Sequence, residues 1–218
     1  MKTFYHIVSF VFHPLWIITY LTLFLVSFDP YIFGFSNPKA KGLLLISVIT
    51  ITAMFPAIAI GLMKALGLIS SFQMKDVKER IAPLVTTGLF YIWLYVNIKN
   101  NDLVPTPMTL FVLGSTISIF TALIINIFSK VSLHAIAAGG MVMAIIMILL
   151  KYCYYDLVLQ VFGCQWIVDQ RGIIYFVILL AGIIGTARLG LGAHKSEDVF
   201  GGYIVGILSQ MLAFNILA

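Results

Sequence analysis

Long apolar stretches dominate this sequence and constrain its fold more than any other feature. A membrane-spanning helix needs about 20 consecutive, mostly apolar residues, and seven windows of roughly this length recur between short charged or proline-containing links. The windows are 3–28, 42–63, 83–98, 107–128, 132–150, 172–187 and 199–218. They suit helices rather than the roughly 10-residue alternating strands of a membrane barrel. The sequence therefore predicts an all-α fold, a polytopic integral membrane bundle of six to seven transmembrane helices.

The composition of the chain agrees with a bilayer environment. Of 218 residues, 61% are hydrophobic and 10% are charged, whereas soluble domains carry about 25% charged residues. This excludes a water-soluble globule, and we expect a single domain over residues 1–218. The formal net charge is +5, but the basic residues are scattered singly, which argues against a nucleic-acid partner. The expected surroundings are the lipids of a bacterial cytoplasmic (inner) membrane, and the oligomeric state stays open.

The basic residues do not decide which way the chain crosses the membrane. If the windows alternate in direction, eight Lys and Arg residues lie on the N-terminal side and five on the other. The positive-inside rule then favours a cytoplasmic N-terminus, but several of the eight can be retained for chemistry, which leaves the orientation open. Residues 151–171, between the fifth and sixth windows, combine aromatic and charged side chains and are typical of an interfacial segment.

Three short polar segments are expected to meet at the membrane face on the N-terminal side, because an even number of windows separates each from the next. They are residues 75–80, 130–134 and 188–198. Together they bring two histidines, two arginines, several lysines and a carboxylate to one face. Taken alone, the first segment is equally well explained as a basic loop between spans, and a lone histidine such as His134 is more often structural.

The third segment carries the most specific pattern, R-x5-H-x3-D, formed by Arg188, His194 and Asp198. If His194 opens the last helix, Asp198 lies on the same helix face and can accept the Nδ1 proton, which leaves Nε2 as a nucleophile. Arg188 offers a planar guanidinium for phosphate oxygens, and Gly190 and Gly192 let the backbone approach an anion closely. The pattern therefore predicts an anion site that contains a nucleophile.

These residues resemble the site of the type 2 phosphatidic acid phosphatases, which share it with the vanadium-dependent haloperoxidases. The pattern of that superfamily has three parts, K-x6-R-P, P-S-G-H and S-R-x5-H-x3-D. Residues 188–198 match the third part apart from its first serine. Ser132 and His134 match the second part, in which Val131 and Leu133 replace the proline and the glycine.

The first part of the superfamily pattern is matched more loosely. Arg80 is the best candidate for the arginine, although Pro83 follows it by three residues rather than directly. Gln73 stands where the pattern has its lysine, which leaves Lys75 and Lys78 as alternatives for that cation.

The resemblance implies a single transmembrane phosphatase-like domain that hydrolyses a phosphomonoester or pyrophosphate of a lipid through a phosphohistidine intermediate. His194 would attack phosphorus, oriented by Asp198, and His134 would protonate the leaving alkoxide. The phosphoryl oxygens would be held by Arg188, Arg80, Ser132 and Lys75 or Lys78. This scheme requires no metal and no other cofactor, and a lipid phosphate is the expected partner of the site.

A second class of function stays open at this stage, a non-enzymatic membrane protein. It would be either a transporter for an anionic solute or a catalytically degenerate relative that binds lipid phosphate without turning it over. An inward-facing ionisable cluster suits a transporter. Transporters, however, usually carry such charges near the midplane, whereas here they lie at the ends of the windows.

Two further features of the first windows bear on these expectations. His6 and His13 lie on one face of the first window, where packing or interfacial hydrogen bonding is the default over a haem or metal site. Members of the superfamily commonly have six spans and an extracytoplasmic site. Seven windows therefore imply an external N-terminus or a miscount, and the short window 83–98 in the hairpin 83–128 is the first place to look for it.

Overall fold

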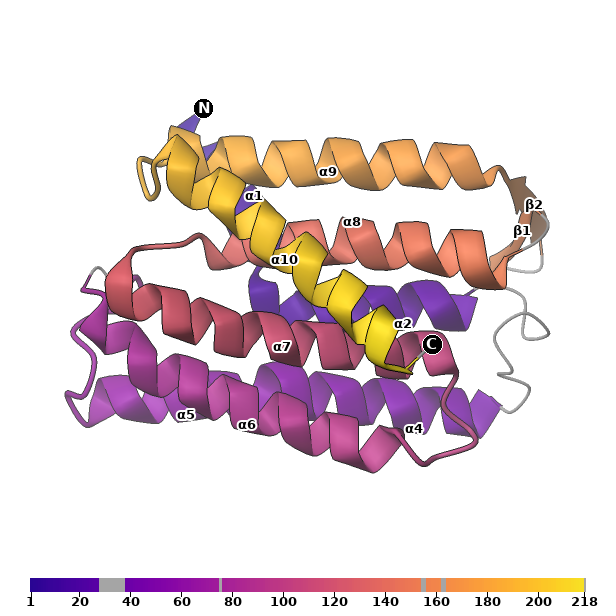
Figure 1. Cartoon of the computed structure of the whole chain (residues 1–218), viewed down its shortest axis with the longest axis horizontal. Coiled ribbons are helices and arrows are strands. Elements are labelled where there is room, and N and C mark those ends of the chain that lie inside the picture. Colours follow the sequence, from indigo (N-terminus) through magenta and orange to yellow (C-terminus); the bar gives the residue numbers. More distant parts are fainter. Residues whose placement is uncertain (28–37, 75, 154–155, 162–163, 218) are drawn as a thin grey trace.

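The structure, a computed structural model of the chain, describes residues 1–27, 38–74, 76–153, 156–161 and 164–217. Figure 1 shows long helices packed side by side, with a two-stranded hairpin at one end. Among the described residues, seven helical segments are long and apolar enough to cross a membrane. The predicted fold class, an all-α polytopic bundle, is thereby confirmed.

The helices follow the windows of the sequence closely. In chain order the helical elements are α1 (Lys2–Val11), the 3-10 turn η1 (Pro14–Trp16), α2 (Ile17–Ser27), α4 (Pro38–Ile49), the π-helical turn η2 (Thr50–Met54), α5 (Phe55–Ala65), the 3-10 turn η3 (Lys78–Arg80), α6 (Ile81–Ile98), α7 (Thr106–Phe128), α8 (Leu133–Tyr152), α9 (Gln170–Gly190) and α10 (Ser196–Leu217). The irregular turn η2 joins α4 to α5 just before Pro56, which lacks the N–H that a regular helix would donate.

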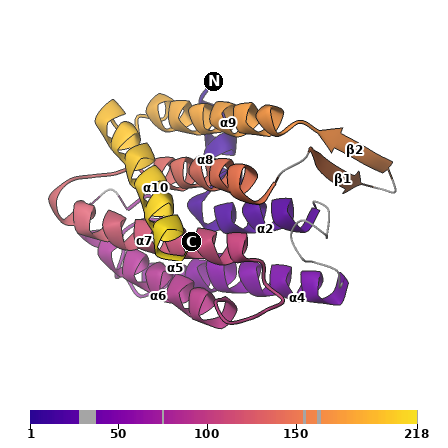
Figure 2. The same ribbon diagram turned by 45° about the vertical axis from the view of Figure 1, so that its right-hand side comes forward.

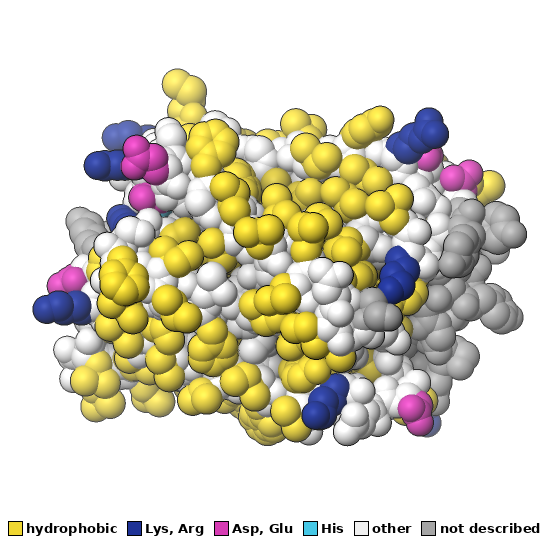
Figure 3. Space-filling model, viewed as in Figure 1, with side chains coloured by type: hydrophobic (Ala, Val, Ile, Leu, Met, Phe, Trp, Pro, Cys, Tyr) yellow, Lys and Arg dark blue, Asp and Glu magenta, His cyan; other side chains and the backbone are white. Residues whose placement is uncertain are grey.

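The surface has the distribution of polarity that a bilayer requires. On the face shown in Figure 3, hydrophobic side chains cover the middle of the molecule, and acidic and basic side chains lie at its two ends. Large apolar side chains stay exposed in this way, including Leu43 at 67%, Phe200 at 66% and Phe176 at 63%. A soluble monomer rarely exposes large contiguous apolar patches, whereas lipid tails solvate them. The chain is an integral membrane protein.

The first window is a bent segment rather than one straight helix. α1 ends at Val11, and Pro14, which has no N–H, begins η1. The Nδ1 atom of His13 accepts a hydrogen bond from the Leu15 N–H at 3.4 Å and so caps the new turn. Figures 1 and 2 show that α1 runs across α8 and α9, whereas α2 lies alongside the long helices. His13 therefore lies at the joint between two helices of different direction.

The hairpin 83–128, which the sequence marks as the first place to look for a miscount, consists of two regular helices. The turn η3 continues into α6, so the helical segment Lys78–Ile98 has 21 residues. The sequence window begins only at Pro83 because the charged side chains of the preceding turn interrupt the apolar run. The break in direction described above lies in the first window instead.

Residues 151–171, predicted as an interfacial segment, contain a β-hairpin. The strand β1 (Leu157–Val161) pairs antiparallel with β2 (Cys164–Val168), in a register that sets Leu159 opposite Trp166. Figure 2 shows the hairpin beyond the ends of α8 and α9. The sequence does not reveal these strands because the run LVLQV lacks the strict polar–apolar alternation that marks a half-buried strand.

Glycines bring α8 and α10 into backbone contact. A Cβ atom on Gly206 would lie 2.1 Å from the carbonyl oxygen of Ile136, and one on Gly202 would lie 2.8 Å from that of Ser132. Small residues four apart allow membrane helices to approach this closely. The first turns of the two helices consequently meet, and the Ser132 N–H donates to the Asp198 carbonyl at 3.1 Å.

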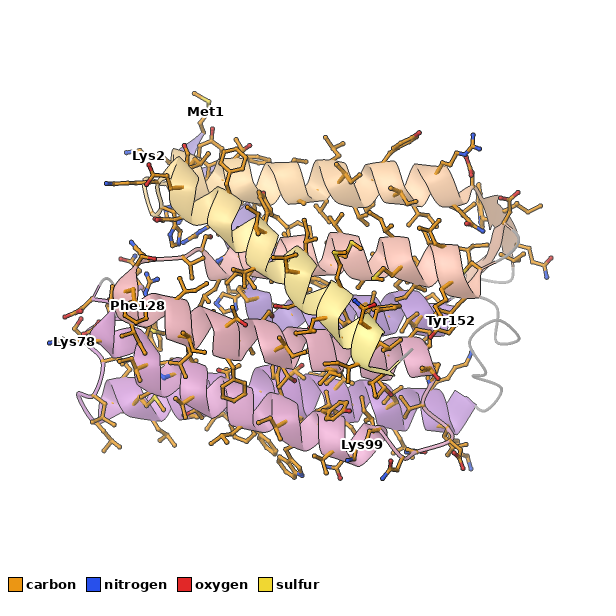
Figure 4. All side chains as sticks on the ribbon, in the orientation of Figure 1. Met1, Lys2, Lys78, Lys99, Phe128 and Tyr152 are labelled. Atoms are coloured by element: carbon orange, nitrogen blue, oxygen red, sulfur yellow. The ribbon has the colours of Figure 1, made fainter. Side chains whose placement is uncertain are left out.

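The three polar segments lie at one end of the bundle, called the site end below. In Figure 1 the connections α5–α6, α7–α8 and α9–α10 all lie at the left, and the C-terminus lies toward the right. Figure 4 places Lys2 and Lys78 at the site end and Lys99 at the opposite end. The N-terminus and the polar segments therefore share one membrane face, as the alternation of the windows predicts.

Candidate functional site

A cavity of about 1150 Å³ lies among the helices and reaches the site end. Its charged and polar lining at that end comes from Lys2, His6, Ser9, His13, Arg80, Lys130, His134, Arg188 and His194. Further along the helices the lining becomes largely apolar and includes Tyr91, Phe111 and Ile119, with Gln210 among them. The cavity thus joins a polar cluster near the membrane face to an apolar interior.

His194 lies in the tight connection between α9 and α10, where Asp198 fixes its orientation. Gly192 has a φ of 64°, a value that favours glycine, and the chain turns back so that α10 begins at Ser196, two residues after His194. The Nδ1 atom of His194 lies 3.3 Å from Oδ2 of Asp198, which also accepts from the Lys195 N–H at 3.1 Å. A carboxylate only accepts, so Nδ1 carries the proton and Nε2 keeps its lone pair.

The imidazole of His194 is neutral at neutral pH. Its pKa is lowered to about 4, chiefly by burial and next by the positive charge of Arg188. The hydrogen bond from Asp198 acts in the opposite direction and raises the pKa, but less strongly. A neutral imidazole with a free Nε2 lone pair is the state that a nucleophile requires.

Besides Lys2 at the start of α1, three cations line the cavity close enough to act on the charge of His194. They are Arg80, Lys130 and Arg188. Within the described residues, none of the three lies within ion-pair distance of a carboxylate, although the charge of Asp198 attracts Arg80 and Lys130 from farther away. Gathering like charges in a partly buried place costs free energy unless an opposite charge joins them. The cluster is therefore suited to an anion.

Main-chain carbonyls hold two of these cations in place. Arg80, only 8% exposed, donates from Nε to the Met74 carbonyl at 3.0 Å. Lys130 donates from Nζ to the Ala193 carbonyl at 2.9 Å and so ties the α7–α8 connection to the α9–α10 connection. Its pKa is lowered, first by burial and then by the charge of Arg80. Both side chains are positioned before any ligand arrives.

Arg188, in the last turn of α9, has an unused donor. Its Nη1 donates to the Oγ of Ser9 on α1 at 3.1 Å. Its Nε is buried and has no hydrogen-bond partner among the described residues. A guanidinium binds an oxyanion best through two parallel N–H groups. The unpaired Nε therefore marks a position for an oxyanion.

His134, the second residue of α8, faces α1. The α8 N-terminus is capped by Ser132, whose Oγ accepts from the Ala135 N–H at 3.4 Å. The Nε2 atom of His134 lies 3.0 Å from the Ser9 carbonyl oxygen, which can only accept, so Nε2 carries the proton. The ring also meets that of His13 edge-on, with centroids 5.4 Å apart. His134 thus shares the cavity with His194 but has its N–H engaged.

The remaining predicted site residues lie away from the cavity or outside the described part. Ser132 is fully buried as a helix cap and is not part of the cavity wall. Lys78 is exposed at the site end and does not line the cavity either (Figure 4). Lys75 lies outside the described residues. The cation that joins the two arginines in the cavity is Lys130 instead.

The sequence pattern gives no role to three residues that line the cavity. Lys130 precedes the second motif directly, and its position in that polar segment is a signal that could have singled it out. Ser9 and His13 lie in the first window, where the pattern has no counterpart. Both residues line the cavity because the chain bends at Pro14. The apolar run around Pro14 does not specify the direction of this bend.

No group of three or more His, Cys, Asp or Glu side chains within the described ranges is arranged to hold a metal ion. Comparisons of the chain with protein families, with curated proteins and with solved structures gave no match. A proposal for the function therefore starts from the residues of the cavity.

Proposed function

We propose that this protein is a membrane lipid phosphatase, similar to the type 2 phosphatidic acid phosphatases, that hydrolyses a phosphomonoester or pyrophosphate of a lipid. One observation carries the proposal: a neutral histidine, held by a carboxylate, shares a cavity with three cations that have no carboxylate partner among the described residues. Phosphoryl transfer needs little beyond a positioned nucleophile and compensation of charge on the phosphoryl oxygens. The cavity offers both.

In the first half-reaction, the Nε2 lone pair of His194 attacks phosphorus, and the bond from phosphorus to the lipid oxygen breaks. The imidazole becomes positively charged, and Asp198 stabilises that charge through Nδ1–H. The three cations compensate the negative charge on the other phosphoryl oxygens. His134, in the doubly protonated form that a bound phosphate favours, gives its Nε2 proton to the leaving oxygen and becomes neutral. The products are the dephosphorylated lipid and a phosphohistidine.

In the second half-reaction, water attacks the phosphorus atom of the phosphohistidine. His134, which has lost its proton, takes one from the water, and the P–N bond breaks. His194 recovers its lone pair and inorganic phosphate leaves, so the cycle consumes one water molecule. Dividing the reaction at a covalent intermediate replaces one difficult step by two easier ones.

The apolar part of the cavity supports a lipid rather than a water-soluble phosphate ester. Beyond the charged cluster, the wall is formed by side chains such as Ile18, Leu84 and Phe111. Burying apolar surface stabilises a complex by roughly 25 cal/mol per Å². A substrate with an alkyl or isoprenyl chain would gain from this wall, whereas a sugar phosphate would not.

The decisive experiment measures phosphate release by the purified protein in detergent from a panel of lipid phosphates. The panel contains phosphatidate, phosphatidylglycerophosphate, a polyprenyl pyrophosphate and a lipid A phosphate. His194→Ala is expected to lower turnover by at least about 10³, the scale seen when one member of a cooperative nucleophile unit is lost. Lys195→Ala, with an exposed side chain next to it, is the matched control. Near-normal turnover by His194→Ala would contradict the proposal.

A second candidate, a degenerate relative that binds lipid phosphate without hydrolysing it, is favoured by the contact between His134 and Ser9. The N–H that would protonate the leaving group already donates to a main-chain carbonyl. If this contact is permanent, the site binds an anion but cannot release the lipid alkoxide. Binding of lipid phosphate without any phosphate release from the panel would identify this candidate.

A further inference from the structure

Ser9, on α1, engages two residues of the proposed site at once. Its carbonyl oxygen accepts from Nε2 of His134 at 3.0 Å, and its hydroxyl oxygen accepts from Nη1 of Arg188 at 3.1 Å. Both donors are needed by the proposed reaction, one for the leaving oxygen and one for a phosphoryl oxygen. In this state Ser9 therefore places two neutral oxygen atoms where a bound phosphate would place its own.

The helix that carries Ser9 has one face toward the cavity and another toward the outside. Its cavity-lining residues Lys2, His6 and Ser9 are spaced three or four positions apart. Apolar side chains on the remaining surface are exposed, among them Phe4 at 56% and Ile7 at 57%. An exposed apolar face in a membrane protein faces lipid. α1 thus lies between the bilayer and the charged cluster.

α1 is joined to α2 by a segment that can bend without breaking a helix. Phe12 and His13 have non-helical conformations, with ψ of 40° and 139°. Pro14 has no N–H to bond back into α1, so the regular hydrogen bonds of α1 end before the joint. Such a short non-helical segment at the end of an element is what absorbs the angular change in hinge motions.

The body of α1 also packs against α8 and α9. Val8 lies in one apolar cluster with Ala138, Ala181, Ile184 and Ala187. The ring of Tyr5 lies over Gly190, where a Cβ would be 2.3 Å from the ring. With the two Ser9 hydrogen bonds, these contacts hold the helix against the site. Of these contacts, a ligand in the cavity can replace the two Ser9 hydrogen bonds, because it can accept from the same donors.

We propose that α1 is a gate between the bilayer and the phosphate site, held closed by Ser9 and opened when a phosphate replaces Ser9 at Arg188 and His134. The inference rests on the proposed function and adds how the lipid reaches the site. A guanidinium can bind a phosphate through two parallel hydrogen bonds and by the attraction of opposite charges, whereas it gives the Ser9 hydroxyl a single bond. A phosphate therefore displaces the serine and frees the His134 N–H for the leaving group.

The first test is the affinity of the purified protein for inorganic phosphate, measured by isothermal titration calorimetry in detergent. Ser9→Ala removes a bond that exists only in the closed state, so a larger fraction of the protein is competent to bind. We expect the Kd for phosphate to fall about tenfold, a change within the range that loss of one hydrogen bond to a charged group produces. Thr3→Ala removes an exposed hydroxyl from the same helix and is expected to leave the Kd unchanged.

The outcomes separate the gate from the proposed function. An unchanged or higher Kd in Ser9→Ala, with clear binding by the wild-type protein, would overturn the gate alone. Folded wild-type protein that binds no phosphate would overturn both. Tighter binding by Ser9→Ala but not by Thr3→Ala supports the gate.

A second measurement follows the position of α1 directly. A Ser9→Cys variant is labelled with a sulfonated maleimide, with Cys164 replaced by Ser. The other cysteine, Cys153, is buried, and burial raises its pKa to about 11, so it reacts slowly. Saturating inorganic phosphate is expected to speed labelling at position 9 at least threefold, because the thiol leaves Arg188. Slower or unchanged labelling would mean that α1 stays in place over the bound anion, which overturns the gate.

Discussion

His194 is held in its neutral form by opposing influences. Burial and the nearby cations lower its pKa to about 4, while the Asp198 hydrogen bond limits the fall. Burial is the larger influence, and the cations that attract a phosphate add to it in keeping the nucleophile unprotonated.

A pH profile of kcat/KM tests this balance, since it reports the ionisation of groups in the free enzyme. Protonation removes the Nε2 lone pair, so the activity due to His194 should stay level from neutral pH down to about 5 and fall below about 4. Asp198→Asn removes the influence that raises the pKa. It should move this acid limb to still lower pH while lowering kcat. Glu197→Gln, an exposed neighbour, serves as the control. An acid limb near the ordinary histidine value of about 6.5 would contradict the assignment.

His134 should matter in proportion to how poor the leaving group is. An alkoxide needs a proton as it leaves, whereas an aryl oxide is already a stable anion. His134→Ala is therefore expected to lower kcat/KM more for a lipid phosphomonoester than for nitrophenyl phosphate, with both measured in one detergent preparation. Equal losses on the two substrates would leave His134 as a positioning residue that packs against α1 and would strip it of the role of an acid.

The sequence predicted contacts within one segment of the site, but it did not predict contacts between residues of different segments. The pairing of His194 with Asp198 follows from four residues of separation around a helix start, and the structure contains it. The Ser9 contacts join positions 125 and 179 residues apart. These contacts depend on the angle between α1 and α2 at Pro14, and no local sequence pattern specifies that angle. The sequence also left Lys78 open as the cation beside the two arginines. In the structure Lys130 lies in the cavity with them instead.

At the scale of elements, the α8–α10 crossing sets the geometry of the site. Gly206→Ala would place a Cβ 2.1 Å from the Ile136 carbonyl oxygen, a main-chain atom that cannot rotate away. We expect a loss of about 1–3 kcal/mol or more, as for other overpacked contacts, measured as a lower midpoint of thermal unfolding in detergent. The same substitution should also move the first turns of α8 and α10 apart. We therefore expect it to weaken phosphate binding as well.

Gly201→Ala is the matched control for this crossing, because a Cβ at position 201 would meet nothing within 4 Å. It should leave the unfolding midpoint unchanged or raise it, since alanine favours a helix over glycine by about 1 kcal/mol. If both variants unfold alike, the close approach of α8 and α10 does not contribute to stability.

The positions of the helices were predictable because a membrane span leaves a strong compositional signal. Bends within a span and short strands between spans were not predictable. The windows 107–128 and 132–150 agree with α7 and α8 to within a few residues. The bend after α1 was missed because it lies in a long apolar run, and the hairpin of β1 and β2 was missed because its strands lack strict polar–apolar alternation. Hydropathy reports that a segment enters a bilayer, but it does not report the direction in which the segment runs.

At the scale of the whole molecule, the site and the N-terminus belong to one membrane face. Single cysteines at Thr3 and Glu197, both exposed at the site end, should react with a membrane-impermeant maleimide from the same side of sealed vesicles. A cysteine at Asn101, exposed at the opposite end, should react only from the other side. Labelling of positions 101 and 197 from one side would contradict the alternation of spans between them.

The short second helix has a consequence for the membrane itself. With 11 residues, α2 measures about 16 Å at 1.5 Å per residue, against a hydrocarbon core of about 30 Å. Because α1 turns aside instead of extending this length, the lipids around the bend meet a protein surface of roughly half the usual height. A bilayer adapts to such a mismatch by thinning locally. We therefore expect the phosphates of one leaflet to lie closer to Arg188 beside α1, and substrate to arrive by lateral diffusion in the plane of the leaflet, without a passage through water.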